Sequence, residues 1–173
     1  MAKRSFVVGD VHAELEHLER LWSRLPELDA EDTLVFLGDY VDRGPDSQGV
    51  LEWLRSLPER CEAKLVFLRG NHEDGWLRVI NGGWPEFVLP QPNGTWACVR
   101  SYRGRPAPEE QPTKEDLEAL FSGSFFPPEV VEWMSALEGT GIRRAYYVQD
   151  YEPYFFPQGS REEKRARESY GLF

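Results

Sequence analysis

The fold is decided by residues 33–39, which read Thr33-Leu34-Val35-Phe36-Leu37-Gly38-Asp39. This apolar run is too short for an ordinary helix and is typical of a buried strand. Similar runs occupy residues 6–8 and 64–68, and residues 15–25 and 47–57 between the runs have helical periodicity. The order β-α-β-α-β predicts an α/β fold with a parallel sheet, right-handed crossovers and helices on both faces.

Each predicted strand ends in a glycine followed by a side chain that could bind a metal ion. These side chains are Asp10, Asp39 and Asn71, and His12 stands two residues after the first of them. Ligands of such sheets bind beyond the carboxyl ends of the strands, so we expect the three ends to form one site. A Gly-Asp-x-His segment on its own could equally be a turn in which Asp10 caps the following helix.

The second and third strand ends carry more charge than a simple turn requires. Residues 38–44 contain Asp39, Asp42 and Arg43, and residues 70–73 add an amide, an imidazole and a carboxylate. Charged groups gathered at a strand end are costly unless partners compensate them. A bound cation and a phosphate group would supply those partners.

Residues 9–12, 38–44 and 70–73 together resemble the three signatures of the phosphoprotein phosphatase family, which belongs to the calcineurin-like metallophosphoesterases. The resemblance covers about the first eighty residues. It implies a calcineurin-like αββα sandwich, here with an incomplete second half. It also implies a phosphoester hydrolase that depends on divalent metal.

By this resemblance Asp10 and His12 hold a first metal ion, and Asp39 bridges to a second ion that Asn71 also binds. Oxygen ligands mixed with one imidazole suit Mn²⁺, with Fe or Zn²⁺ as alternatives. The ions of the family activate a shared water for in-line attack on phosphorus.

The resemblance also implies the groups that act on the substrate. Arg43 and Asn71 would bind the phosphoryl oxygens, and a guanidinium offers a fork that matches phosphate. His72, oriented by Asp42, would protonate the leaving alkoxide, and an imidazole held by a carboxylate is a competent general acid near neutral pH.

The sequence departs from the family in its histidines. The family completes the second metal site with two later histidines, whereas the three histidines here are His12, His17 and His72. We interpret His17 as a solvated or partly buried helix residue. Three explanations are open: a shortened or frameshifted chain, which we favour, carboxylates such as Asp150 or Glu152 as ligands, or a symmetry mate that completes the site. We expect a second ion to bind weakly or not at all.

The 173 residues predict one domain, since domains usually hold roughly 100–200 residues. Residues 1–82 form the metal-binding core and residues 83–173 a proline-rich flank. The flank has helical patches near residues 114–121 and 129–137, and an aromatic segment at 145–156 could form one or two strands.

The composition limits the partners of the protein. Its 20 Lys and Arg against 30 Asp and Glu give a net charge of −10, and no contiguous basic segment offsets it. Such a charge disfavours binding to nucleic acid or to an anionic membrane. Cys61 and Cys98 lack a CxxC spacing and are interpreted as buried or idle thiols. The apolar run that follows the first five residues is too short for the core of a signal peptide, so we expect a cytoplasmic protein.

The leading hypothesis for the function is a serine/threonine protein phosphatase that acts on phosphorylated proteins, with a small phosphoester as the other possible substrate. A symmetrical bis(5'-nucleosyl)-tetraphosphatase shares the same signatures and is the second enzymatic hypothesis. The absent histidines motivate a third, a degenerate member that binds metal or phosphate without turnover.

Overall fold

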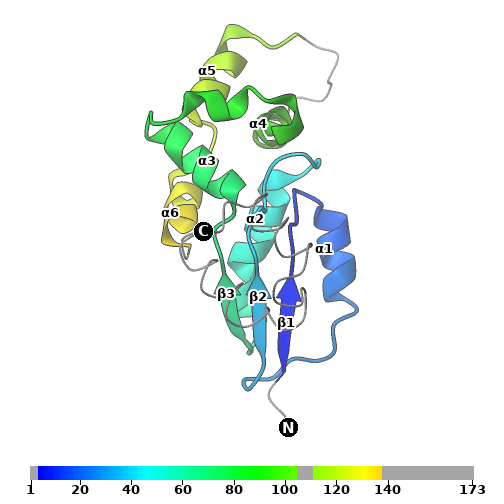
Figure 1. Cartoon of the computed structure of the whole chain (residues 1–173). Helices are drawn as coiled ribbons and strands as arrows, with labels where there is room; N and C mark the ends of the chain where they lie inside the picture. The colour runs from blue at the N-terminus through cyan, green and yellow to red at the C-terminus, as the bar shows by residue number, and fades with distance from the viewer. Residues whose placement is uncertain (1–3, 105–110, 138–173) are drawn as a thin grey trace, which may run out of the picture. The chain divides into compact units, whose positions relative to one another are not determined.

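Three short parallel strands form one sheet (Figure 1). The computed structural model describes residues 4–104 and 111–137. The strands β1 Ser5–Val8, β2 Thr33–Phe36 and β3 Lys64–Phe67 lie in the order β1-β2-β3. Val8 is level with Phe36, and Phe36 with Phe67, so the carboxyl ends of all three strands meet at one edge. The α/β class and the parallel sheet are therefore confirmed.

Nine helical elements accompany the strands within the described residues. The α-helices are α1 Leu15–Trp22, α2 Ser47–Ser56, α3 Asn71–Ile80, α4 Thr95–Arg103, α5 Lys114–Ser122 and α6 Pro128–Ala136, and the 3₁₀ helices are η1 Leu57–Glu59, η2 Pro85–Val88 and η3 Gln91–Asn93. Four of the α-helices occupy segments that the sequence predicts. The periodicity missed α3, which begins with polar residues, and α4, whose Thr95 and Val99 have low helix propensity but are buried by packing.

Helices α1 and α2 lie on the same face of the sheet. The rings of Trp22 in α1 and Trp53 in α2 meet edge-on at 5.6 Å. Leu34 and Phe36 are buried on one face of β2, whereas Val7, on the opposite face of β1, is 45% exposed. Within the described residues, α1 and α2 therefore cover one face of the sheet, whereas the sequence predicts helices on both faces. When parallel strands follow one another in the order β1-β2-β3 and both crossover connections are right-handed, both connecting helices lie on the same side of the sheet.

The segment after residue 83 contributes to the core rather than only flanking it. Helix α4 packs on α2, α5 packs on α3 and α4, and α6 packs on α3. Cys98 of α4 and Met134 of α6 are fully buried. The burial of Cys98 agrees with the prediction of a buried thiol, whereas Cys61 is half-buried. The aromatic segment predicted to form strands lies outside the described residues. None of the described helices combines the length and apolar character that a membrane span needs.

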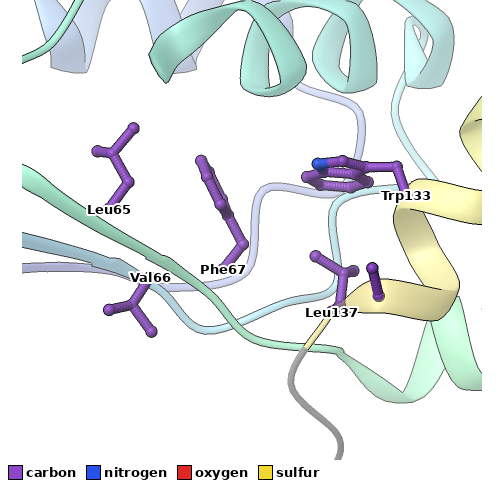
Figure 2. A pocket seen from close by; sticks show the side chains of 6 residues that line it. Leu65, Val66, Phe67, Trp133 and Leu137 are labelled. Carbon is purple, nitrogen blue, oxygen red and sulfur yellow. The ribbon is translucent and has the colours of Figure 1, made fainter.

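A pocket of about 220 Å³ lies between β3 and α6 (Figure 2). Leu65, Val66 and Phe67 line it from β3, and Trp133, Ala136 and Leu137 from the end of α6. All six lining residues are apolar and none is a predicted site residue. The pocket is therefore separate from the polar groups at the strand ends.

Arg4 and Asp32 fasten the beginning of β1 to that of β2. Arg4 Nε donates to Asp32 Oδ1 at 2.9 Å, and a second bond from the guanidinium reaches the other carboxylate oxygen. The Asp32 backbone carbonyl also accepts from Lys64 N at 2.9 Å, at the start of β3. The hydrogen bond from Arg4 holds the pKa of Asp32 well below its ordinary value of 3.8, although burial acts in the opposite direction.

This pair predicts a pH-dependent contribution to stability. Because the folded protein lowers the pKa of Asp32, its contribution is complete above pH 3.8 and is lost as the pH falls further. We expect Asp32→Asn to lower the melting temperature by on the order of a few degrees at pH 7, and the difference from wild type to shrink below pH 3.8. Thermal melts followed by circular dichroism measure both, with Glu27→Gln as a control. A difference that stays constant down to pH 2.5 would contradict this assignment.

Candidate functional site

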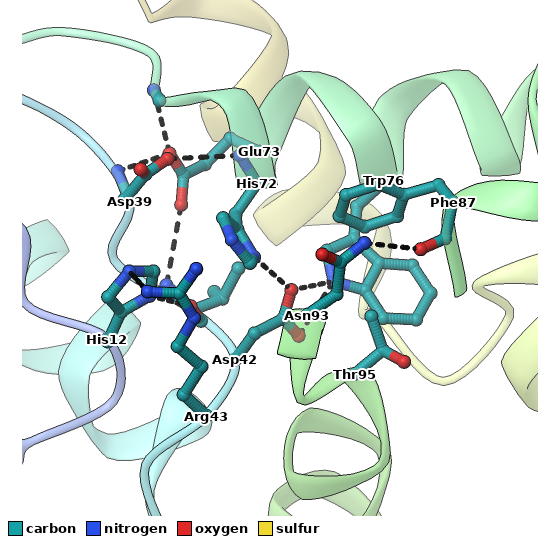
Figure 3. A network of polar contacts seen from close by, with 12 residues as sticks. His12, Asp39, Asp42, Arg43, His72, Glu73, Trp76, Phe87, Asn93 and Thr95 are labelled. Atoms are coloured by element: carbon teal, nitrogen blue, oxygen red, sulfur yellow. Dashed lines mark hydrogen bonds and ion pairs between the residues drawn. The ribbon is translucent and has the colours of Figure 1, made fainter. Parts of the chain in front are cut away.

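The carboxyl ends of the strands bring His12, Asp39 and His72 together, as the sheet geometry predicts (Figure 3). One side-chain donor atom from each of these residues lies within 4.8 Å of the others. His12 follows β1, Asp39 follows β2, and His72 lies in the first turn of α3 after β3. Residues separated by up to 60 positions in the chain therefore form one cluster.

The loops of the site adopt strained backbone conformations. His12, Asp39, Asp42 and Arg43 have φ angles of 43°, 54°, 70° and 69°, in the left-handed region that side chains other than glycine seldom occupy. Such conformations cost about 1–3 kcal/mol each and persist where the surrounding structure enforces them. Non-glycine residues with this geometry concentrate at functional sites, in agreement with the cluster found here.

A glycine at the end of β3 permits the second and third loops to touch. A Cβ atom built on Gly70 would lie 2.0 Å from Asp39 Oδ1 and 2.1 Å from Asp39 N. Any larger residue at this position would push the loops apart and displace the carboxylate. The glycine of residues 70–73 is thus required by the close approach of the backbone to Asp39.

His12 has one ring nitrogen directed toward the site and the other held by the backbone. Its Nδ1 lies 3.1 Å from the carbonyl oxygen of Val41, so this nitrogen carries the proton and donates it. Its Nε2 is then an acceptor, and Arg43 Nη1 lies 2.9 Å from it. A neutral imidazole whose tautomer is set by a backbone carbonyl is the form that binds metal ions.

Asp39 is 8% exposed and presents its carboxylate beside His12. One of its oxygens, Oδ1, accepts from the backbone N–H of His72 at 3.0 Å. This bond orients the carboxylate. Together with the Nε2 lone pair of His12, Asp39 forms a mixed imidazole and carboxylate donor set that fits a divalent cation.

Glu73 ties the ends of β2 and β3 together, a role that the sequence analysis missed. Its buried carboxylate accepts from the backbone N–H groups of Asp39, Tyr40 and Gly70 at 2.8, 2.7 and 2.8 Å. Burial and the charge of Asp39 raise the pKa of Glu73 to about 7, against the effect of these N–H donors. The only signal in the sequence was its place at the end of residues 70–73.

Asp42 and His72 form a buried pair. His72 Nδ1 lies 2.7 Å from Asp42 Oδ2, and the two residues are 1% and 0% exposed. Burial acts to lower the pKa of His72, but the hydrogen bond and charge of Asp42 outweigh it and raise that pKa. Since Nδ1 donates its proton to Asp42, the Nε2 atom of His72 is the one available to exchange a proton within the site.

Asp10 and Asn71, the other predicted metal ligands, are more exposed to solvent than the three residues of the cluster. Asp10 is exposed, and its Oδ2 lies 3.9 Å from His12 Nε2. Asn71 is the first residue of α3 and is exposed. His17 is exposed and lies 3.0 Å from Glu14 Oε2, as expected of a solvated helix residue. The proposed surrogate ligands at positions 150 and 152 lie outside the described residues.

The chain is similar in sequence to known phosphohydrolases. Residues 3–153 match the Calcineurin-like phosphoesterase family. A Caenorhabditis elegans protein with the provisional name serine/threonine-protein phosphatase is 39% identical over 90 residues, which cover 52% of this chain and 24% of the relative. A symmetrical bis(5'-nucleosyl)-tetraphosphatase of Legionella pneumophila (strain Corby) is 39% identical over 80 residues, covering 46% of this chain and 28% of the relative.

A solved structure of a protein serine/threonine phosphatase from Saccharomyces cerevisiae also matches, with 20% identity and a TM-score of 0.37. The match covers 72% of this chain and 36% of that one. The chain matches about a quarter of the length of the two curated relatives named above.

Proposed function

The chain belongs to the calcineurin-like phosphoesterase family, and from this premise we propose that it hydrolyses phosphoserine and phosphothreonine esters in proteins. One observation carries the proposal: the buried Asp42–His72 pair lies directly beside His12 and Asp39 (Figure 3). A proton donor and a cation-binding donor set thus share one site, and phosphoester hydrolysis needs both.

Metal use accompanies membership of this family, and the donor set indicates which residues would hold the ion. His12 and Asp39 supply a lone pair and a negative charge, and we propose that Asp10 and Asn71 add further oxygen ligands from the rim. A bound divalent cation lowers the pKa of a coordinated water and stabilises charge on phosphoryl oxygens. Mn²⁺ is the ion we propose, with Fe or Zn²⁺ as alternatives, because the donors mix oxygen with imidazole.

Arg43 is the residue we propose to bind the phosphoryl group, together with Asn71. Its guanidinium is exposed, and one of its N–H groups already reaches His12 Nε2 at 2.9 Å. A cation on the Nε2 lone pair of His12 would replace this hydrogen bond, and the freed guanidinium would be within reach of a phosphate bound beside the cation. A planar guanidinium can offer two parallel hydrogen bonds to a phosphoryl group, which fixes its orientation as well as its charge.

His72 is the proposed general acid. Asp42 holds the Nδ1 proton, so a second proton on Nε2 can be donated to the oxygen of the departing serine or threonine. The raised pKa of His72 keeps a larger fraction of the ring protonated near neutral pH than an ordinary histidine would have. The pair therefore supplies the proton that an alkoxide leaving group requires.

The alternative substrate is a dinucleoside tetraphosphate, because the Legionella relative with that activity in its name matches at the same 39% identity as the nematode protein. Both reactions break a bond to phosphorus and need the same donors. The residues that line the site do not separate the two substrates, since each presents a phosphoryl group.

A direct comparison of substrates tests the proposed function. With Mn²⁺ supplied, we expect a higher kcat/KM for phosphate release from a phosphothreonine peptide than for hydrolysis of diadenosine tetraphosphate, and a tenfold difference would correspond to about 1.4 kcal/mol of differential transition-state binding. Phosphate release and nucleotide chromatography measure the two reactions. The reverse ranking would favour the tetraphosphatase. Absence of turnover, with p-nitrophenyl phosphate included, while calorimetry still detects Mn²⁺ binding, would favour a non-catalytic member.

A further inference from the structure

The carboxylate of Asp42 has a second side-chain partner that the proposed mechanism does not use. The indole Nε1 of Trp76 lies 3.0 Å from Asp42 Oδ1 and 3.0 Å from Asp42 Oδ2. Asp42 and Trp76 are both 0% exposed. A single N–H group is thus shared between the two oxygens of the carboxylate that orients His72.

The local structure explains why the histidine and the indole reach the same carboxylate. His72 and Trp76 are four residues apart in α3, so their side chains lie one above the other on the same face of the helix. The backbone N–H of Asp42 donates to Ser47 Oγ at 3.1 Å, which fixes the loop from the other side. Asp42 is therefore held by groups from both α2 and α3.

Trp76 is itself immobilised by aromatic contacts. Its ring meets those of Phe87, Phe125 and Phe126 edge-on, with centroid distances of 5.9, 5.1 and 5.3 Å. Phe87 also meets the ring of His72 at 5.7 Å. These phenylalanines come from the part of the chain after residue 83, which the sequence predicts to be a flank. Phe87 therefore packs against both His72 and Trp76, and the other two phenylalanines hold Trp76 alone.

An indole N–H is a donor only, whereas an ionised carboxylate accepts at two oxygens. Without the indole, the buried Asp42 carboxylate would lose a strong N–H donor and keep only the weak thiol of Cys98 beside the imidazole, and a buried acceptor that lacks a good donor is costly. The carboxylate could then turn toward other donors and away from His72 Nδ1. The shared bond removes this freedom, because it ties both oxygens to one fixed atom.

We propose that Trp76 is a positioning residue for proton donation by His72. Its indole N–H fixes the carboxylate plane of Asp42, which in turn directs His72 Nε2 toward the leaving oxygen. This inference rests on the proposed phosphoester hydrolysis. The competing interpretation is that Trp76 is only a large core residue, and removal of its N–H separates the two because the ring can be kept.

Trp76→Phe retains an aromatic ring and removes the donor. If Trp76 acts through His72, the loss should depend on how much the leaving group needs a proton. We expect kcat to fall about tenfold on phenyl phosphate, a part of the 10²–10⁴-fold that a general acid contributes, and less than about twofold on 2,4-dinitrophenyl phosphate, whose phenolate leaves unaided. KM should change little, since no contact to the substrate is removed.

Two further variants make the result decisive. Trp53→Phe is the matched control, because Trp53 is also buried but contacts Trp22 and Arg60 instead of Asp42, and it should retain wild-type kinetics. In a His72→Asn background, Trp76→Phe should cause no further loss on phenyl phosphate, because the two residues act as one unit. Equal losses on both substrates, or additive losses in the double variant, would show a merely structural role.

A spectroscopic measurement distinguishes failure of this inference from failure of the proposed function. In wild-type protein we expect a downfield Nδ1–H proton signal from His72, and Trp76→Phe should shift or broaden it while the melting curve stays cooperative. If wild-type protein hydrolyses no phosphoester, the proposed function fails, and an altered His72 signal would still support positioning by Trp76. An unchanged signal would overturn the positioning role regardless of activity.

Discussion

Asp39→Asn is expected to abolish bound metal and to reduce phosphatase turnover by at least about a hundredfold. Loss of a residue that only orients a metal ligand can already cost up to about a hundredfold, and loss of the ligand itself should cost no less. Asp39 presents the buried carboxylate of the cluster, next to His12 Nε2. The substitution is well suited to the position, because asparagine tolerates the left-handed φ of 54°. Its amide oxygen can still accept from the backbone N–H of His72, so the main change is the loss of negative charge.

Metal content after desalting, measured by inductively coupled plasma spectrometry, is the primary measurement for this variant. Asp74→Asn is the matched control, because it makes the same change of carboxylate to amide in α3 at a residue that pairs with Arg78 at 2.9 Å and is not a member of the cluster. The control should retain metal and activity. Unchanged metal stoichiometry in Asp39→Asn would show that the cation binds elsewhere.

His72→Asn is expected to lower kcat by about 10²–10⁴-fold, the range that a general acid contributes, with little change in metal content or melting temperature. Asp42→Asn should follow the same pattern. An amide at position 42 can turn its NH₂ group toward His72 Nδ1 and so favour the wrong ring tautomer. In both variants the loss should be greater for phenyl phosphate than for 2,4-dinitrophenyl phosphate, because only the first leaving group needs a proton.

The measurement of metal in these two variants also tests the assignment of His72. The structure groups a nitrogen of His72 with His12 and Asp39, so the ring is close enough to be considered as a ligand. Bound metal in His72→Asn at the wild-type level supports the role of proton donor. A parallel loss of metal and activity would instead make His72 a ligand and leave the general acid to be found.

The sequence alone was sufficient for the central sheet and for most of the cluster. Short apolar runs at residues 6–8, 33–37 and 64–68 specify strands through local hydrophobic patterning, and the helices between them require a parallel arrangement. Parallel strands align their carboxyl ends, so chain order predicts one site at that edge, and two of the predicted metal ligands, His12 and Asp39, lie together there with His72. The pairing of Asp42 with His72, implied by the family resemblance, is confirmed at 2.7 Å.

Only the tertiary structure showed what surrounds and supports this cluster. Glu73 bonds to backbone groups 33 and 34 positions away, and Trp76 to a carboxylate 34 positions away. The position of Phe87 against both His72 and Trp76, and the exposure of Asp10 at the rim, likewise depend on how distant segments pack. Local patterning encodes which residues form an element and which end of it they occupy. Contacts between elements arise from the close packing of side chains in three dimensions, which no periodicity in the chain records.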